Sequence, residues 1–211
     1  MSAKRIASAL GVLLALAFPF VDFGWLAGIS NISPQGATII VKLVVAVTLG
    51  VIAFGIRKRP LSFFHIRRFS WLDLVYMVMA IGATFLLVAA AAPLIGYPGD
   101  ASETSDATEV PLAVGLAGVL AAGLLEEFIY RGFLIEELGE LLHNRWLAAS
   151  ISVFFFGLAH GNSDYGWSLA LVVPGLAGLV ITLLYLWRRN LPICVLMHIS
   201  IDLMYTLAHR S

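Results

Sequence analysis

The sequence predicts an all-α fold, a polytopic membrane bundle of about seven transmembrane helices. Its 211 residues are 60% hydrophobic and only 12% charged, with a mean hydropathy of +0.94. A water-soluble domain of this length cannot bury so much apolar surface. The apolar residues also form runs of roughly 20 residues, the length needed to cross a bilayer. Without internal repeats or a soluble segment between runs, we expect one membrane domain over residues 1–211.

The predicted spans, in chain order, are residues 6–29, 36–56, 71–97, 110–134, 146–161, 167–187 and 191–208. The first follows Lys4 and Arg5 and contains a small-x-small stretch at Ala15–Ala17, as a signal-peptide cleavage site would. Because the apolar run continues to Ile29, we interpret it as an uncleaved span. The fifth run is short and ends in the polar stretch HGNSDYG, which is tolerated at membrane depth only inside protein or beside water.

The placement of charge predicts the orientation of these spans. Basic residues occur at Lys4, Arg5, Arg57, Lys58, Arg59, Arg67, Arg68, Arg145, Arg188 and Arg189. With seven spans they all fall on one side, and the acidic residues Asp100, Glu103, Asp106, Glu109 and Asp164 fall on the other, where only Arg210 is against the rule. Cytoplasmic segments are rich in Lys and Arg, so we expect a cytoplasmic N-terminus. Short loops favour a bacterial inner membrane as the location.

The stretch LLEEFIYRGFLIEEL, residues 124–138, places two adjacent carboxylates and an arginine in a predicted span. Ionisable groups inside a span are costly unless paired or hydrated, which makes them functional candidates. Glu127 and Arg131 are four residues apart and can form an ion pair on one helix face. Glu126 points about 100° away from Glu127, so we assign Glu126 to chemistry and Glu127 to support. The alternative is that both carboxylates lie in a solvated helix end.

The same four-residue interval recurs in two later spans. His198 and Asp202 share a face of the last span, and Phe156 and His160 repeat the spacing in the fifth. A single buried histidine is usually a packing residue. Three spans that each carry such groups favour a shared polar site.

The predicted depths of these groups agree. If the fourth and fifth spans turn near His143, then Glu126 lies 17 residues before that turn and His160 lies 17 residues after it. At 1.5 Å per residue, Glu126 and His198 would each lie about 12 Å inside the membrane. We expect Glu126 and His198 at one level. His160 reaches this level if its helix begins in the cytoplasm or if the polar loop after it dips into a wet cavity.

In this order the motifs resemble the CAAX prenyl protease and bacteriocin-processing (Abi) family of intramembrane endopeptidases. Its pattern of Glu-Glu-x-x-x-Arg, Phe-x-x-x-His and His-x-x-x-Asn or Asp is found here at Glu126–Arg131, Phe156–His160 and His198–Asp202. The resemblance covers residues 110–208, so residues 106–211 are expected to hold the catalytic helices and residues 1–105 to be spans without motifs. It implies cleavage of a peptide or lipidated protein in a membrane cavity open to the cytoplasm. The prenyl protease branch has Asn where this chain has Asp202.

The chemistry of amide hydrolysis suggests a role for each group. It requires an activated water and stabilisation of the charge that develops on the carbonyl oxygen. We expect Glu126 to activate the water, His160 to orient it and His198 to donate to the oxyanion. Asp202 would fix the orientation of His198. Phe156 and Arg131 would support the site.

Two other chemistries use the same residues. Glu126, His160 and His198 form a recognised ligand set for a catalytic zinc ion that holds the water in its fourth position. The HExxH signature is absent, and we favour a metal-free site without a cofactor. Cys194 precedes His198 by four residues, but a small buried cysteine is ordinarily inert.

Other function classes also fit part of the pattern. A non-catalytic membrane protein or regulator could hold a peptide or lipid in the same cavity. Proton-coupled transporters also use intramembrane carboxylates and histidines, but this chain has no second half related to the first. A formal net charge of zero gives no reason to expect a nucleic-acid partner, and membrane lipids are the expected surroundings.

Three further charged residues lie in or near predicted spans. We expect Lys42 to reach an interface or a neighbouring helix. Asp22 and Asp73 lie close enough to span ends for hydration, so we expect no mechanistic role for them.

Overall fold

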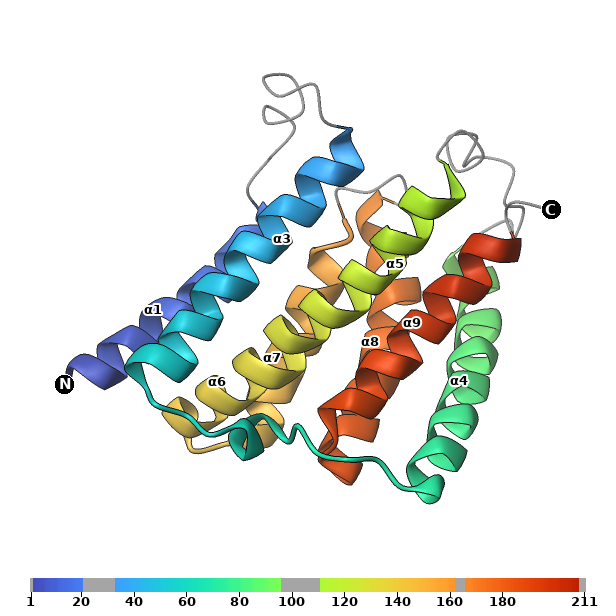
Figure 1. The fold of residues 1–211 in the computed structure, drawn as a ribbon. Coiled ribbons are helices and arrows are strands. Elements are labelled where there is room, and N and C mark those ends of the chain that lie inside the picture. The colour runs from blue at the N-terminus through green and yellow to red at the C-terminus, as the bar shows by residue number, and fades with distance from the viewer. Residues whose placement is uncertain (1, 21–32, 96–110, 162–165, 209–211) are drawn as a thin grey trace.

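The computed structural model describes residues 2–20, 33–95, 111–161 and 166–208. The helices are α1 Ala3–Ala17, α3 Pro34–Gly50, α4 Trp71–Ala91, α5 Leu112–Glu127, α6 Ile135–Leu142, α7 Arg145–Leu158, α8 Gly166–Arg188 and α9 Leu191–Ala208 (Figure 1). No strand occurs within the described ranges. The predicted all-α bundle is therefore confirmed.

In the described part of the chain, six helical segments are long and apolar enough to cross a membrane. They are Ala3–Phe20, Gly36–Ile56, Trp71–Ile95, Leu112–Leu142, Leu171–Arg188 and Leu191–Ala208. The fifth predicted span, residues 146–161, is α7, which has only 14 residues and is as short as the sequence suggested. The protein is an integral multi-pass membrane protein.

The fourth span is longer than predicted. A π-helical stretch, Phe128–Leu134, joins α5 to α6 in one 31-residue helix that ends at Leu142 rather than at residue 134. Its last turns are amphipathic, since Leu138 is buried among apolar side chains while Glu137 and Glu140 pair with arginines. Those ion pairs link the polar extension to Arg57 and Arg59.

The predicted turn between the fourth and fifth spans is confirmed. His143 ends α6 in the left-handed conformation with φ 53°, and Asn144 caps α7 by accepting a hydrogen bond from the Leu147 amide at 3.0 Å. Asparagine is among the preferred residues at that position, because its side-chain oxygen satisfies a free amide of the first turn. α6 and α7 therefore pack as a tight hairpin.

Helices that are consecutive in the chain do not always lie side by side. α3 lies at one edge of the bundle with α1, whereas α4 packs against α8 and α9 at the opposite edge (Figure 1). Residues 57–70, here called the strap, run across one end of the bundle to connect them. The Leu191 amide donates to the His65 carbonyl at 3.1 Å, and Arg67 donates to the carbonyls of Arg188 and Arg189 at 2.6 and 3.0 Å.

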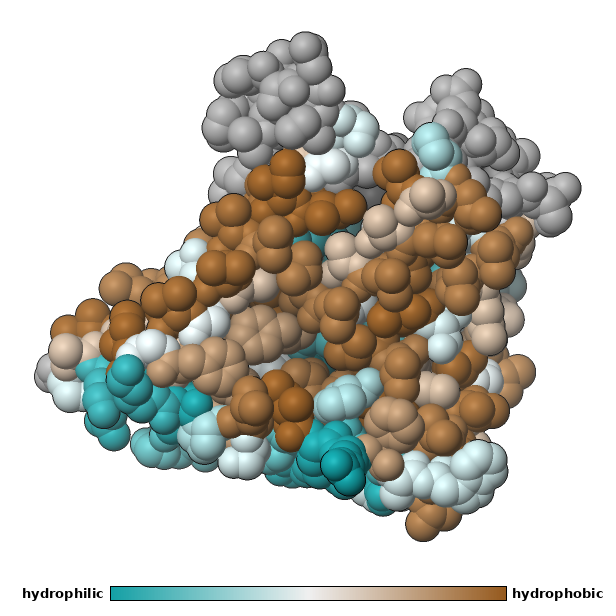
Figure 2. Space-filling view, in the orientation of Figure 1, coloured by the Kyte–Doolittle hydropathy of each residue, from teal (hydrophilic) through white to brown (hydrophobic). Residues whose placement is uncertain are grey.

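The strap gathers the basic residues at one end of the molecule. Arg57 and Arg59 form ion pairs with Glu137 and Glu140 on α6. Figure 2 shows hydrophilic surface along this end and mostly apolar surface above it. The acidic residues predicted for the opposite side lie outside the described residues, so which end faces the cytoplasm stays a prediction.

The structure corrects the expectation that Asp73 is hydrated. We predicted a hydrated carboxylate near a span end, but Asp73 is fully buried. Its side chain caps α4 through Ser70 and accepts a hydrogen bond from Arg188 Nε at 2.7 Å. We had expected water around this carboxylate because Asp73 lies near a span end. Arg188, 115 residues away in the chain, takes the place of that water. Asp22 lies outside the described residues.

Candidate active site

The π-helical stretch positions the first motif. π-helical turns are rare and occur often at functional sites, since they insert an extra residue into a turn. Here the stretch begins directly after Glu127 and contains Arg131. The Tyr130 carbonyl accepts a hydrogen bond from Ser152 on α7 at 2.9 Å. The local irregularity is thereby tied to the neighbouring helix.

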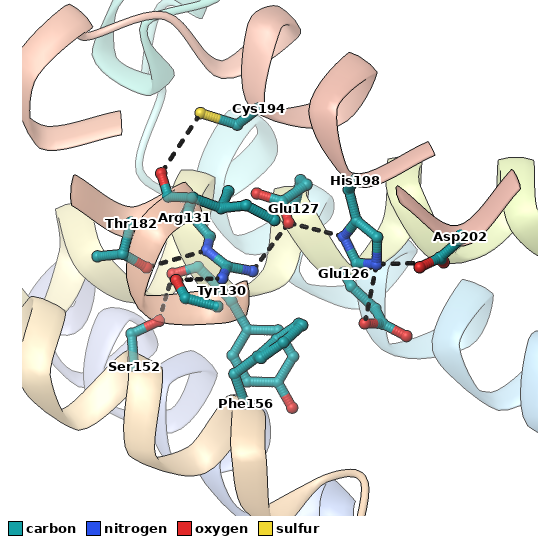
Figure 3. A network of polar contacts seen from close by, with 12 residues as sticks. Glu126, Glu127, Tyr130, Arg131, Ser152, Phe156, Thr182, Cys194, His198 and Asp202 are labelled. Carbon is teal, nitrogen blue, oxygen red and sulfur yellow. Dashed lines mark hydrogen bonds and ion pairs between the residues drawn. The ribbon is translucent and has the colours of Figure 1, made fainter. Parts of the chain in front are cut away.

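Arg131 is fully buried and every part of its guanidinium has a partner (Figure 3). Nη1 donates to Glu127 Oε1 at 2.8 Å, Nε to Thr182 Oγ1 at 3.2 Å, and Nη2 to the Gly178 carbonyl at 2.9 Å. The guanidinium carbon also lies 4.3 Å from the centre of the Phe156 ring. The predicted ion pair between Glu127 and Arg131 is confirmed, and the other two hydrogen bonds of Arg131 join this helix to α8.

One carboxylate oxygen of Glu127 accepts hydrogen bonds from two residues. Its Oε1 accepts from Arg131 and also from His198 Nδ1, both at 2.8 Å. A carboxylate only accepts hydrogen bonds, so Nδ1 of His198 carries a proton. We predicted that Asp202 would orient His198, yet the carboxylate on Nδ1 is Glu127. Asp202 instead lies 3.4 Å from Nε2, on the other side of the ring.

Glu126 faces away from Glu127, as its position on the helix predicted. Its Oε1 is bonded to the ammonium of Lys42 on α3. Its Oε2 is buried and has no hydrogen-bond partner among the described residues. This oxygen lies 3.9 Å from Nε2 of His160 and 3.9 Å from Nε2 of His198. Three groups from three helices therefore face one small space.

His160 is held in one orientation by its own helix. Its Nδ1 donates to the Phe156 carbonyl, four residues earlier, at 2.8 Å. A carbonyl can only accept, so in the neutral ring Nε2 is left as an acceptor toward Glu126. The Phe156 ring lies between Arg131 and the two histidines, with centroid distances of 4.9 Å to His160 and 5.9 Å to His198.

Comparison with known proteins finds a family model and a relative that this chain resembles in sequence. Residues 108–204 match the family model for "Type II CAAX prenyl endopeptidase Rce1-like", and that range contains all three motifs. Over these residues, which make up less than half of the chain, the protein is similar to this family. The chain is also 33% identical over 91 residues to UPF0177 protein YvdC of Lactococcus lactis subsp. lactis (strain IL1403). The alignment covers 43% of this chain and about a third, 33%, of that relative's length. No solved structure matches.

The spacing of the side chains around Glu126 is a poor fit for zinc. Ligands about 2.05 Å from a tetrahedral zinc ion lie roughly 3.3 Å apart, whereas Glu126 Oε2 lies 3.9 Å from each imidazole nitrogen. Among the residues that the structure describes, no group of three or more suitable side chains is close enough to hold a metal. Lys42 also brings a positive charge to Glu126. Zinc would require the two histidines to approach the carboxylate.

Lys42 contacts Glu126, and the sequence did not predict that it would be part of the candidate site. It lies in the half of the chain without motifs, 84 residues before Glu126. The expectation that it reaches a neighbouring helix is confirmed. The sequence did show a charged residue inside a predicted span. It could not show which residue Lys42 contacts, because the spacing of residues within one helix does not predict contacts between α3 and α5. Thr182 and Gly178 were likewise missed, because an ordinary hydroxyl and a glycine carry no signal in an apolar helix.

Cys194 is fully buried and lies apart from Glu126, His160 and Asp202 in the candidate site. Its sulfur lies 3.5 Å from the Asn190 carbonyl and 3.8 Å from the Ile181 carbonyl. A cysteine so enclosed is inert packing, as expected.

Proposed function

We propose that the protein is an intramembrane endopeptidase in which Glu126 activates the attacking water. The observation that carries this proposal is the buried Oε2 of Glu126, which has no hydrogen-bond partner among the described residues. An unpartnered buried carboxylate oxygen is costly and is uncommon unless a water, an ion or a catalytic role accounts for it. Its neighbours, His160 and His198, are groups that hold a water or an oxyanion.

The spacing suits a water molecule. A separation of 3.9 Å between Glu126 Oε2 and each imidazole nitrogen is too long for a direct hydrogen bond. A water about 2.8 Å from Oε2 can lie at the same distance from one of these nitrogens. In the proposed reaction this water donates to Glu126 and to His160 Nε2 and attacks the carbonyl carbon of the peptide. Glu126 takes its proton and then passes it to the leaving amine.

Charge balance supports His198 as the donor to the oxyanion. The site holds three carboxylates, those of Glu126, Glu127 and Asp202. Lys42 and Arg131 supply two permanent positive charges. Because Nδ1 of His198 already donates to a carboxylate, a second proton on Nε2 makes the ring a cation. Three positive charges then equal three negative ones, and Nε2–H can stabilise the oxyanion.

The substrate class follows from the family and from the surroundings of the site. A family described as CAAX prenyl endopeptidases suggests a peptide attached to a lipid. Apolar side chains cover the outer face of the helices that carry the site, as in Leu120 and Leu124 on α5. We propose a peptide or protein substrate delivered from the membrane and a cavity open to the cytoplasmic side.

The test is cleavage by Glu126→Gln. Purified wild-type protein in lipid vesicles should generate new peptide termini from a farnesylated peptide ending in a CAAX sequence or from solubilised bacterial membrane proteins. Glu126→Gln should lose this activity by more than about 10³-fold while it stays folded and binds the same peptide. Glu140→Gln, on the exposed part of the same continuous helix, is the matched control and should keep its activity. Cleavage by Glu126→Gln at the wild-type rate would refute the role of the carboxylate.

Chelation separates the metal-free mechanism from the zinc mechanism. Prolonged incubation with a strong chelator should leave the wild-type activity unchanged, and elemental analysis of active protein should give far less than one zinc per chain. If zinc is bound, Glu126, His160 and His198 would hold it, and loss of any one should remove metal and activity together. Inactivation by chelation that is reversed by zinc would replace our proposal with that one.

A further inference from the structure

Lys42 is a charged residue on a helix that otherwise presents apolar side chains to the membrane. Its neighbours Ile40, Leu43 and Val44 are exposed, whereas the Lys42 side chain is only 23% exposed and its ammonium is bonded to Glu126. A lysine in a span is costly unless it is paired. The ion pair with Glu126 therefore explains how a lysine is tolerated in this span. It also links the half of the chain without motifs to the site.

The contact also determines what Glu126 can do. The last torsion of a glutamate side chain is broad and two-fold, so an unrestrained carboxylate exchanges its two oxygens and varies in plane. Lys42 binds Oε1, and Oε2 is the oxygen that faces His160 and His198. One oxygen is thus anchored by a cation from α3, and the other is presented to the space between the imidazoles.

We infer that Lys42 is a positioning residue that holds Glu126 in the orientation required of a general base. This inference rests on the proposed function, because it assigns the role of Lys42 through the catalytic role of Glu126. Errors of about 1 Å in the placement of a reacting group can cost on the order of 10²-fold in rate. Loss of the anchor should therefore reduce the rate of the chemical step rather than the affinity for substrate.

The packing of α3 does not depend on this lysine. Val41, Val45, Ala46 and Leu49 on the same helix are buried in the apolar core. Replacement of Lys42 by methionine keeps a side chain of similar length and leaves that core unchanged. A variant at this position can accordingly report on positioning without loss of the fold.

The experiment compares Lys42→Met and Lys42→Arg by kcat and KM on the farnesylated CAAX-type peptide, or on the peptide most rapidly cleaved by wild type if that one is not a substrate. Lys42→Met should lower kcat on the order of 10²-fold with KM within about twofold of wild type. Lys42→Arg, which keeps a cation on Oε1, should retain roughly a tenth of kcat or more. Lys58→Met, in the exposed part of the strap, is the control and should match wild type. If Lys42→Met folds poorly, Lys42→Gln takes its place under the same criteria.

Two results would overturn the inference. Wild-type kcat in Lys42→Met would show that Glu126 needs no anchor, and a raised KM with unchanged kcat would mean that Lys42 contacts the substrate instead. Glu126→Gln is measured in parallel to separate the two proposals. If it is inactive while Lys42→Met is fully active, only the role of Lys42 fails. If it is active, the proposed function itself fails.

Discussion

At the residue scale, the site is organised by two adjacent carboxylates with different partners. Glu127 is bonded to Arg131 and His198, and its role is to orient those groups. Glu126 is bonded to Lys42 through one oxygen, and the other has no hydrogen-bond partner among the described residues and is the oxygen that we propose activates water. A turn of about 100° between neighbouring helix positions is enough to place the two side chains in different surroundings.

Glu127 should matter more to His198 than Asp202 does. Groups that orient a catalytic imidazole typically contribute 10–100-fold to activity. We expect Glu127→Gln to lower kcat by about that factor, because an amide accepts the Nδ1 proton more weakly than a carboxylate. Asp202→Asn should lose less than about tenfold, and Asp202→Ala should lose more than Asp202→Asn. Steady-state cleavage kinetics would give the order, and a fully active Glu127→Gln would contradict the assignment.

At the element scale, close approach of helices brings the motifs together. Gly178 on α8 lets Phe156 and Arg131 pack against the helix backbone. A Cβ added at Gly178 would lie 2.6 Å from a ring carbon of Phe156 and 3.2 Å from Arg131 Nη2. Gly123 on α5 allows the same approach by Ile199 of α9. Gly178 thus admits Phe156, whose ring contacts both histidines, and Gly123 admits the helix that carries His198.

Gly178→Ala should therefore damage both stability and activity. Phe156 and Arg131 would have to shift to admit the methyl group, and overpacking of this kind costs about 1–3 kcal/mol. Activity should fall with it, since both side chains contact the site. Gly82→Ala on α4 is the matched control, because a Cβ there meets nothing within 4 Å, and it should be neutral or slightly stabilising. Thermal unfolding in detergent and cleavage assays would compare the two, and equal stability would contradict the packing argument.

At the scale of the whole molecule, the strap holds together helices that are distant in the bundle. It begins at the end of the helical segment that continues α3, passes α6 and the turn between α8 and α9, and ends at the start of α4 (Figure 1). Its arginines form ion pairs with Glu137 and Glu140, and the His65 carbonyl accepts a hydrogen bond from the Leu191 amide. Burial and the nearby Arg189 lower the pKa of His65 below its usual value. A neutral His65 adds no further charge to this basic end.

The orientation in the membrane is testable through this basic end. Lys58→Cys and Arg68→Cys should be shielded from impermeant thiol reagents in intact cells, because the strap is predicted to be cytoplasmic. Thr104→Cys, in the connection predicted for the other side, should react. The native Cys194 is buried and should give no background. Labelling at Lys58→Cys together with protection at Thr104→Cys would reverse the orientation.

The sequence by itself determined the membrane class, the helical spans, the α6–α7 turn and the three motifs. These features depend on local composition and on the 3.6-residue period of a helix, which place Glu127 with Arg131 and His198 with Asp202 wherever the helices go. Only the tertiary structure decided that Glu127 binds His198 across 71 residues, that Lys42 binds Glu126 across 84, and that Arg188 meets Asp73 across 115. Those pairs arise from which helices pack together and at what distance. No periodicity within a single helix encodes that choice, since it depends on side-chain shape and on glycines that admit close contact.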